Sequence, residues 1–441
     1  MDFLTKKYQD LLKDGSIEPN LYEQYRVKRG LRNDNGTGVL VGLTKVAEVS
    51  GYYVENDIKM PKKGNLYYRG IDIRDVVKLA GDDYGYINTC FLLLFGHYPS
   101  TEEADRFMDI IRDNYDLPDG YLEDVILKSP SKSLMNHIAR CILALYSYDD
   151  DPDNLDGLEL IKKAVSLIGK MPAIIAYSLQ AKTHYLDKDS LHIHFPKKEY
   201  TFAANLLYMS RNDGKFTELE AKTLDRCLMV HADHGGGNNS AFVGTCVAST
   251  LTDLYAMITA SLSSLKGPRH GGANMAVQDM MAVIIDDIGL DASDDEIRKV
   301  LVKILNKKYF DNSGLIYGLG HAIYTLSDPR CEILKEEARK LSHEKGLDKK
   351  YEFYLKVERI GLELLEEKNG KKSCANVDYY SGFIYDMLNI PRDLFIPIFA
   401  CARIVGWVAH DIETLLYCNK IVRPATKYVG EEYDDYTKNN K

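Results

Sequence analysis

The sequence predicts a mainly α-helical protein with a few short β-strands near its N-terminus. Three observations predict this fold class. Apolar residues recur at helical spacing almost without interruption after Gly70. Stretches rich in valine and tyrosine, which favour strands, are found between residues 39 and 70. Three serine or threonine residues are each followed three positions later by glutamate, a pattern that starts helices. The pairs are Ser100 with Glu103, Thr217 with Glu220, and Ser293 with Glu296.

The N-terminal region is expected to hold a surface helix, a turn and then the strands. Residues 1–16 carry early acidic residues and no apolar core segment, so neither a secretory signal nor a transit peptide is expected. The turn is predicted at residues 33–38, which read NDNGTG. The strands are predicted within residues 39–56 and 65–70.

Length, charge and cysteine content limit the function classes. The 441 residues suffice for two domains, or for one large domain with a smaller one inserted. The formal net charge of −9 provides no broad positive field, so neither nucleic acid nor an anionic membrane is an expected partner. The eight cysteines are scattered and form no CxxC pair. This distribution is typical of reduced thiols and predicts a cytoplasmic location.

One long segment is almost free of charge, because Asp253 is the only charged residue between residues 235 and 265. Such a segment must be covered by protein or by lipid. Its serines and threonines, together with Asp253, would lack partners in hydrocarbon. We therefore predict one core helix of a large soluble protein, and no membrane span.

Two polar stretches are predicted to lie at the surface. Residues 149–156, DDDPDNLD, are rich in aspartate but lack the glycine and the final glutamate of a calcium loop, which favours a solvated acidic turn. His192 and His194 alternate beside two lysines, a pattern that indicates a surface strand or an extended loop.

Three histidines stand next to glycines, which allow sharp turns and a close approach of the backbone to a ligand. Glycines follow His234 and His270, and glycines precede His321. A single histidine of this kind is more often an ordinary turn residue. Three in one chain favour an active site.

Other charged residues suit an anionic ligand. Arg330 ends the motif SDPR, in which the serine or the aspartate caps a helix and the arginine lies beside its start. Arg403 interrupts an apolar helix, so it needs an anionic partner, either a ligand or an acidic side chain. Arg423 follows that helix. Asp378 lies in a polar segment, either as a reactive carboxylate or as a helix cap.

Five ordered blocks resemble the citrate synthase family, which also contains 2-methylcitrate synthases. The blocks read HADHGGGN, LKGPRHGGAN, YGLGHAIY with SDPR, NVDYYSG, and ARIVGWVAHDIE with RP, and the resemblance extends from about residue 67 to residue 424. It implies a citrate synthase-like two-domain multihelical fold. The large domain would comprise residues 1–271 and 383–441, and the small domain residues 272–382. It also implies a homodimer in which Arg423 completes the site of the other subunit.

The resemblance implies condensation of acetyl-CoA with oxaloacetate and water to give citrate and CoA, a reaction of the tricarboxylic acid cycle. The coenzyme A thioester is a co-substrate, and neither a bound cofactor nor a metal is expected. Asp378 would remove a proton from the acetyl methyl group, His270 would donate a hydrogen bond to the thioester oxygen, and His321 would protonate the new alkoxide. The remaining assignments are oxaloacetate binding by His234, Arg330, Arg403 and Arg423, and coenzyme A binding by Lys371 and Asn376.

Alternative functions stay open at this point. A 2-methylcitrate synthase would use propionyl-CoA, and one methylene changes selectivity by only about 1–3 kcal/mol. A metal-dependent hydrolase could use His231, His234 and His270, although no HExxH motif is present. A relative that only binds ligands would not need to keep the three catalytic residue types. Departures from the family pattern bear on substrate preference. They are Gly235, Ala322, Ala375 and Tyr379.

Overall fold

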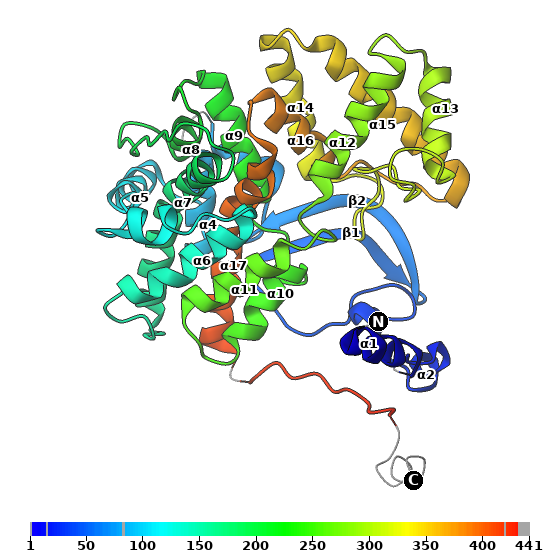
Figure 1. Cartoon of the computed structure of the whole chain (residues 1–441), viewed down its shortest axis with the longest axis horizontal. Coiled ribbons are helices and arrows are strands. Elements are labelled where there is room, and N and C mark those ends of the chain that lie inside the picture. The colour runs from blue at the N-terminus through cyan, green and yellow to red at the C-terminus, as the bar shows by residue number, and fades with distance from the viewer. Residues whose placement is uncertain (1, 15, 82–83, 419, 431–441) are drawn as a thin grey trace. The chain divides into compact units, whose positions relative to one another are not determined.

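The computed structural model describes residues 2–14, 16–81, 84–418 and 420–430 (Figure 1). The chain divides into two compact units. The smaller unit comprises the chain up to Gly42, the hairpin tip Val54–Lys59, and the chain from Val422 onward. The larger unit comprises Leu43–Tyr53 and Met60–Ile421.

The smaller unit begins with three short helices, α1 (Phe3–Asp14), α2 (Pro19–Gln24) and the 3₁₀ helix η1 (Arg29–Leu31). The predicted turn at residues 33–38 is confirmed, because the Asn33 N–H donates to the carbonyl oxygen of Thr37 at 2.8 Å. Within the same unit, the Lys427 ammonium lies 5.6 Å from the ring centroid of Tyr25.

The predicted strands form one sheet of three strands in the order β1-β2-β3. The bounds are Ala47–Glu55 for β1, Ile58–Tyr68 for β2 and Ile71–Asp72 for β3. The β2 and β3 strands are antiparallel, with Tyr67 opposite Asp72. The β2 strand starts seven residues before the expected position 65. Its first half is rich in lysine, so pairing with a neighbouring strand, and not an apolar pattern, makes it a strand.

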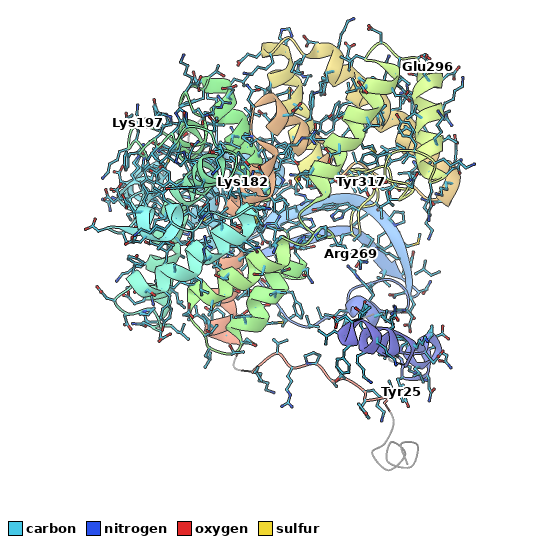
Figure 2. All side chains as sticks on the ribbon, in the orientation of Figure 1. Tyr25, Lys182, Lys197, Arg269, Glu296 and Tyr317 are labelled. Carbon is cyan, nitrogen blue, oxygen red and sulfur yellow. The ribbon has the colours of Figure 1, made fainter. Side chains whose placement is uncertain are left out.

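Helices build almost all of the rest of the larger unit, as predicted. All three capping boxes are present, and Figure 2 labels Glu296 in the first turn of α13. The elements up to residue 265 are α3 (Ile73–Leu79), α4 (Gly85–Phe95), α5 (Thr101–Asp113), the π-helix η2 (Leu122–Leu127), α6 (Leu134–Ala144), η3 (Leu145–Tyr148), α7 (Gly157–Tyr185), α8 (Phe202–Ser210), α9 (Glu218–His231), α10 (Asn239–Ala248) and α11 (Leu254–Leu265).

A second group of helices follows, and its members pack mainly on one another (Figure 1). They are α12 (Ala273–Ile288), α13 (Asp294–Leu305), α14 (Pro329–Glu344), α15 (Asp348–Asn369) and α16 (Val377–Met387). The chain then returns to the first group through η4 (Arg392–Leu394) and α17 (Phe395–Tyr417). The domain boundaries at residues 272 and 382 stay a prediction.

The prediction of one core helix between residues 235 and 265 is wrong, because two helices, α10 and α11, pack against each other there. The chain reverses direction around Leu251, whose φ is 63°. Asp253 then caps α11 by accepting a hydrogen bond from the Ala256 N–H at 2.9 Å. The serine and threonine residues before Asp253 favour a turn, and the aspartate starts a new helix.

Within the part of the chain that the structure describes, two helices are long and apolar enough to cross a membrane by length and composition, namely α7 and the stretch from η4 through α17. In the most apolar window of each, 89% and 83% of the residues are buried inside the protein. We interpret both as core helices. The α17 helix packs on α4, α7, α9, α10 and α11, so its side chains can contact several parts of the molecule at once.

The two polar stretches lie at the surface, as predicted. The acidic turn at residues 149–156 also binds a cation, because its backbone carbonyls at Pro152 and Asn154 accept hydrogen bonds from Lys163 Nζ at 3.0 and 3.1 Å. His192 and His194 lie in an irregular loop and not in a strand.

Candidate active site

Two of the predicted histidines meet between segments that are far apart in sequence. His234 lies in the turn after α9, and His321 lies in the loop before α14. Their ring centroids are 5.3 Å apart, at an interplanar angle of 84°. Tyr324 contacts both rings, because it stacks on His321 at 4.7 Å and lies 5.5 Å from His234. His234 is buried, and its Nε2 atom has no hydrogen-bond partner within the described chain.

His270 lies half-buried in the turn between α11 and α12, directly after Arg269, which Figure 2 labels. The backbone N–H of Ser240 donates to His270 Nε2 at 3.3 Å. An accepting Nε2 places the proton of the neutral ring on Nδ1. Burial, reinforced by the positive charge of Arg403, lowers the pKa of His270 to about 4. At neutral pH this ring is therefore an uncharged hydrogen-bond donor through Nδ1.

His321 has the opposite tautomer. Its Nδ1 atom accepts hydrogen bonds from the backbone N–H groups of Ile323 and Tyr324, both at 3.1 Å. The proton of the neutral ring is then on Nε2. The loop geometry therefore turns the N–H side of His321 away from its own backbone.

Arg330 is buried near the start of α14 and is held by the residue that caps this helix. Of the two candidate caps, Asp328 is the one observed, since its Oδ1 atom accepts from the Arg330 N–H at 3.0 Å. The same carboxylate binds the guanidinium through Nε at 3.0 Å and Nη2 at 2.7 Å. Burial lowers the pKa of Arg330, but the Asp328 carboxylate outweighs that effect and raises it.

Arg403 is buried in the middle of α17 with most of its hydrogen-bonding capacity unused. Its Nε–H donates to the carbonyl oxygen of His231 at 2.6 Å. Its Nη1 and Nη2 atoms are buried without a partner among the described residues. No described acidic side chain forms an ion pair with it, so the alternative of a structural salt bridge is wrong. Burial lowers the pKa of Arg403 to about 10, which still leaves it charged at neutral pH. Two buried, unsatisfied charged donors indicate a site for an anionic ligand.

Asp378 lies half-buried in the first turn of α16, and it is not the helix cap. Asn376 caps α16 by accepting a hydrogen bond from the Asp378 N–H at 3.0 Å. Within the described ranges no hydrogen bond or ion pair reaches the Asp378 carboxylate. Burial raises the pKa of Asp378 to about 6, with Arg330 and Arg403 opposing and Asp328 adding to the shift. The carboxylate is therefore a stronger base than an ordinary aspartate and is still mostly ionised at neutral pH.

Asn376 also fixes Asp378 relative to the histidine loop. Its Nδ2–H donates to the carbonyl oxygen of Gly320 at 2.8 Å, and its backbone N–H donates to that of Gly318 at 2.9 Å. The Asn376 side chain thus caps α16 through Oδ1 and joins this helix to the histidine loop through Nδ2. Lys371 is exposed in the loop before α16. Coenzyme A contacts by Asn376 and Lys371 stay predictions.

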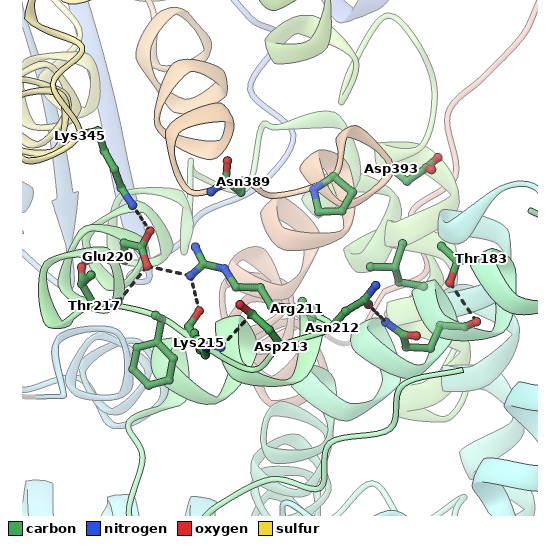
Figure 3. A pocket seen from close by; sticks show the side chains of 15 residues that line it. Thr183, Arg211, Asn212, Asp213, Lys215, Thr217, Glu220, Lys345, Asn389 and Asp393 are labelled. Atoms are coloured by element: carbon green, nitrogen blue, oxygen red, sulfur yellow. Dashed lines mark hydrogen bonds and ion pairs between the residues drawn. The ribbon is translucent and has the colours of Figure 1, made fainter. Parts of the chain in front are cut away.

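Arg423 belongs to the smaller unit, where it is exposed in an extended segment. Its predicted role across a dimer interface stays a prediction. Figure 3 shows a cavity of about 670 Å³ whose lining includes Arg211, Glu220 and Lys345, but none of the site residues predicted from the sequence. The residues that line this cavity are therefore different from those of the histidine cluster.

A metal-dependent hydrolase would need a set of metal ligands, and the described parts of the chain hold none. No group of three His, Cys, Asp or Glu side chains there could hold a metal ion. His231 donates from Nδ1 to the carbonyl oxygen of Cys227 at 2.7 Å within its own helix, and its Nε2 atom is buried without a partner among the described residues.

Sequence reasoning missed the residues that hold the site together. Ser240 Oγ lies 3.1 Å from His270 Nε2 and accepts a hydrogen bond from Trp407 Nε1, also at 3.1 Å. Asp233 and His410 form a buried pair beside the turn that carries His234. The only sequence signal was the spacing of Arg403, Trp407 and His410, which places them on one face of α17.

Comparisons with known proteins show the family of the chain. The family model described as "Citrate synthase, C-terminal domain" matches residues 35–425. Citrate synthase of Haloferax volcanii is 33% identical and is matched over 93% of this chain and 98% of its own length. Citrate synthase of Synechocystis is 34% identical over 85% of this chain and 87% of its own length. A 2-methylcitrate synthase of Shewanella oneidensis is 29% identical over 83% and 88%.

Solved structures give the same result. The ternary complex of citrate synthase from Thermoplasma acidophilum with carboxymethyl coenzyme A and oxaloacetate has a TM-score of 0.75 and 26% identity, covering 92% of this chain and 97% of that chain. Citrate synthase from Pyrobaculum aerophilum has a TM-score of 0.74 and 28% identity, covering 89% and 91%. From the matched blocks, the fold and these relatives, the chain belongs to the citrate synthase family.

Proposed function

We propose that this enzyme condenses acetyl-CoA with oxaloacetate and water to give citrate and CoA. The observation that carries the proposal is the pair of buried, unsatisfied guanidinium nitrogens of Arg403, which matches a substrate carboxylate. The unpartnered Nε2 of buried His234 supports the same ligand. The structural relative from Thermoplasma acidophilum was solved with oxaloacetate and a coenzyme A analogue, which agrees with these two substrates.

The first step is removal of a proton from the acetyl methyl group. We assign this step to Asp378, because burial raises its pKa to about 6 and so strengthens it as a base. The methyl group is a very weak acid, so the developing enolate oxygen needs a hydrogen-bond donor. His270 supplies one through Nδ1–H, and its low pKa keeps the donor uncharged. A neutral donor is closer in proton affinity to the enol than an imidazolium is.

The second step forms the carbon–carbon bond. The enolate carbon attacks the ketone carbon of oxaloacetate, and the ketone oxygen becomes an alkoxide. His321 is assigned to protonate this oxygen, because its backbone hydrogen bonds place the ring proton on Nε2. Water then hydrolyses the citryl thioester, which releases citrate and CoA. Arg330, which Asp328 orients, and Arg403 are assigned to the substrate carboxylates.

We also propose that the enzyme is a cytoplasmic homodimer and that Arg423 acts in the site of the partner subunit. An uncharged surface supports the dimer. The α10 helix has no charged residue, yet Phe242, Val243 and Val247 on it remain partly exposed. The cores of dimer interfaces are depleted of charge in this way. All eight cysteines are free in the structure, which agrees with a reducing compartment.

Closure of the small domain, residues 272–382, onto the large one is part of the proposal, because His234 and Asp378 lie on different predicted domains. One contact between these parts is visible in Figure 3, where Glu220 of α9 binds Lys345 beyond the end of α14. Small-angle scattering should show contraction when oxaloacetate is added. Identical profiles at saturation would contradict closure.

The decisive test is release of coenzyme A thiol by the purified protein, measured with oxaloacetate and either acetyl-CoA or propionyl-CoA. We expect a higher kcat/KM with acetyl-CoA, and citrate as the product by mass spectrometry. A higher kcat/KM with propionyl-CoA would instead identify the 2-methylcitrate synthase that the Shewanella oneidensis relative exemplifies. Absence of thiol release with both thioesters would refute the proposal.

A further inference from the structure

One face of α17 contacts three parts of the active site. Arg403 donates to the backbone carbonyl before the Asp233 turn, and Trp407 donates to the serine that holds His270. One turn later, His410 Nε2 lies 3.3 Å from Asp233 Oδ2. The proposed mechanism uses Arg403 and His270 themselves, but it assigns no part to the pair of His410 and Asp233.

This pair is buried, since Asp233 is 0% and His410 is 2% exposed. Both ring nitrogens of His410 face oxygen atoms, because Nδ1 lies 3.4 Å from the hydroxyl of Thr44. Burial lowers the pKa of His410, but Asp233 outweighs this effect and raises it. For Asp233 burial acts in the other direction and raises the pKa. The charges of His410 and Arg403 outweigh burial, so the pKa of Asp233 lies below its ordinary value. Both shifts favour an imidazolium paired with a carboxylate, which the 3.3 Å contact between His410 Nε2 and Asp233 Oδ2 allows.

Among the described acidic groups, Asp233 provides the main counter-charge to His410. The neighbouring Asp411 has both carboxylate oxygens buried without a partner, and burial raises its pKa to about 8, so it is mostly protonated at neutral pH. Glu413 also favours the charged form of His410, but more weakly than Asp233, and its Oε1 accepts a hydrogen bond from the Lys45 N–H at 2.7 Å.

Asp233 also acts electrostatically on Arg403, the residue with unsatisfied donors. Its negative charge favours the charged form of the guanidinium, although no hydrogen bond joins the two side chains. The backbone of α17 lies directly against the Asp233 turn, because a Cβ on Gly406 would come within 2.5 Å of Asp233 Oδ1. A buried carboxylate so near the anion site would repel a substrate carboxylate unless its charge were balanced.

We propose that His410 balances the charge of Asp233 and thereby leaves the positive charge of Arg403 available to the substrate dicarboxylate. His410 touches no substrate in this scheme, so it is a positioning residue that acts through Asp233. The inference rests on the proposed function, since oxaloacetate is the dicarboxylate concerned. Loss of His410 leaves one uncompensated negative charge, whereas loss of both partners leaves none.

Three variants separate this charge role from a packing role, namely His410→Gln, Asp233→Asn and the double variant. In His410→Gln we expect KM for oxaloacetate to rise about tenfold or more, equivalent to ~1.4 kcal/mol of binding, with kcat nearly unchanged. In Asp233→Asn the buried His410 loses its counter-charge and becomes neutral, so KM should stay within about threefold of wild type. The double variant should also bind oxaloacetate nearly normally, since it too has no net charge.

A packing role predicts the opposite pattern, in which all three variants lose affinity and the double variant is the worst. That result would overturn the inference. The affinity for oxaloacetate is also measured by titration calorimetry, so the comparison of the variants does not depend on turnover. If His410→Gln fails to fold by circular dichroism, a tenfold loss in Asp233→Asn alone would overturn the inference, and near-normal binding in the double variant would support it. An inactive wild-type enzyme would refute the proposed function instead.

Discussion

At the scale of single residues, the backbone sets the tautomers of two histidines in the candidate site. The Ser240 N–H fixes the proton of His270 on Nδ1, and two N–H groups of the loop fix that of His321 on Nε2. Each ring thereby has its donor on the side that does not face its backbone partner. In the proposed mechanism, these two imidazoles share the chemistry with one carboxylate, that of Asp378, whose raised pKa makes it a better base.

Replacing Asp378 by asparagine should remove the base while keeping its size. We expect kcat to fall by about 100- to 10,000-fold, the usual worth of a general base, with little change in the affinity for oxaloacetate. Steady-state thiol release and titration calorimetry measure the two quantities. Asp386→Asn is a matched control, because this exposed aspartate lies on the same helix and pairs, among the described residues, with Lys350. Normal turnover in Asp378→Asn would exclude it as the base.

The pH dependence follows from the raised pKa of Asp378. Only the ionised carboxylate accepts a proton, so kcat/KM should fall about tenfold for each pH unit below about 6. Stability should respond in the opposite sense. A carboxyl group whose folded-state pKa lies above its unfolded value stabilises the protein only while protonated, so its contribution is lost as pH rises through 4 to 6. Asp378→Asn should therefore have a higher Tm than wild type at pH 7.5 and a similar Tm at pH 4. Equal Tm differences at both values would contradict the pKa assignment.

The candidate site residues are recognisable in the sequence, but the residues that contact and hold them are not. His234, His270 and His321 stand beside glycines, and Arg403 is a charge in an apolar helix, so each is locally unusual. Ser240 and Trp407 are ordinary in their own segments, and they are 167 positions apart. Their contact exists only because α17 packs against α10.

At the scale of elements, helix starts were predictable and helix ends within an apolar run were not. The capping boxes at Ser100, Thr217 and Ser293 are local patterns and are all confirmed. The break between α10 and α11 was missed because uncharged serine and threonine residues fit a buried helix and a turn equally well. Only the cap formed by Asp253 distinguishes the two.

The α17 helix should transmit a substitution at Trp407 to His270 through Ser240. Trp407→Phe removes the Nε1–H donor and leaves most of the ring, so we expect kcat to fall about tenfold, equivalent to ~1.4 kcal/mol in the transition state, with KM for oxaloacetate little changed. Ser240→Ala is the matched control, since it removes the hydroxyl that accepts the Trp407 N–H but keeps the backbone donor to His270. The double variant should be no worse than the more impaired single variant. Additive losses would mean that Trp407 acts by another route.

At the scale of the whole molecule, one predicted ligand of the substrate stands apart from the others. Arg423 belongs to the smaller unit, which also contains the N-terminal helices, whereas the other predicted site residues belong to the larger unit. The smaller unit has many exposed apolar side chains, including Phe3 and Leu4 at 70% and Leu40 at 83%. Exposed apolar side chains gathered in one unit are typical of a surface that a partner covers. This agrees with the proposal that subunits exchange Arg423.

Mixing inactive subunits tests the exchange directly. Asp378→Ala and Arg423→Ala parents should each be nearly inactive. If Arg423 serves the partner's site, a mixed dimer has one site with both groups intact and one site with neither. Random pairing makes about half of the dimers mixed, so about a quarter of wild-type activity should return after co-refolding. A tag on one parent, followed by affinity capture and mass spectrometry, verifies that mixed dimers formed. If they form and no activity returns, Arg423 either acts within its own chain or has no part in the reaction.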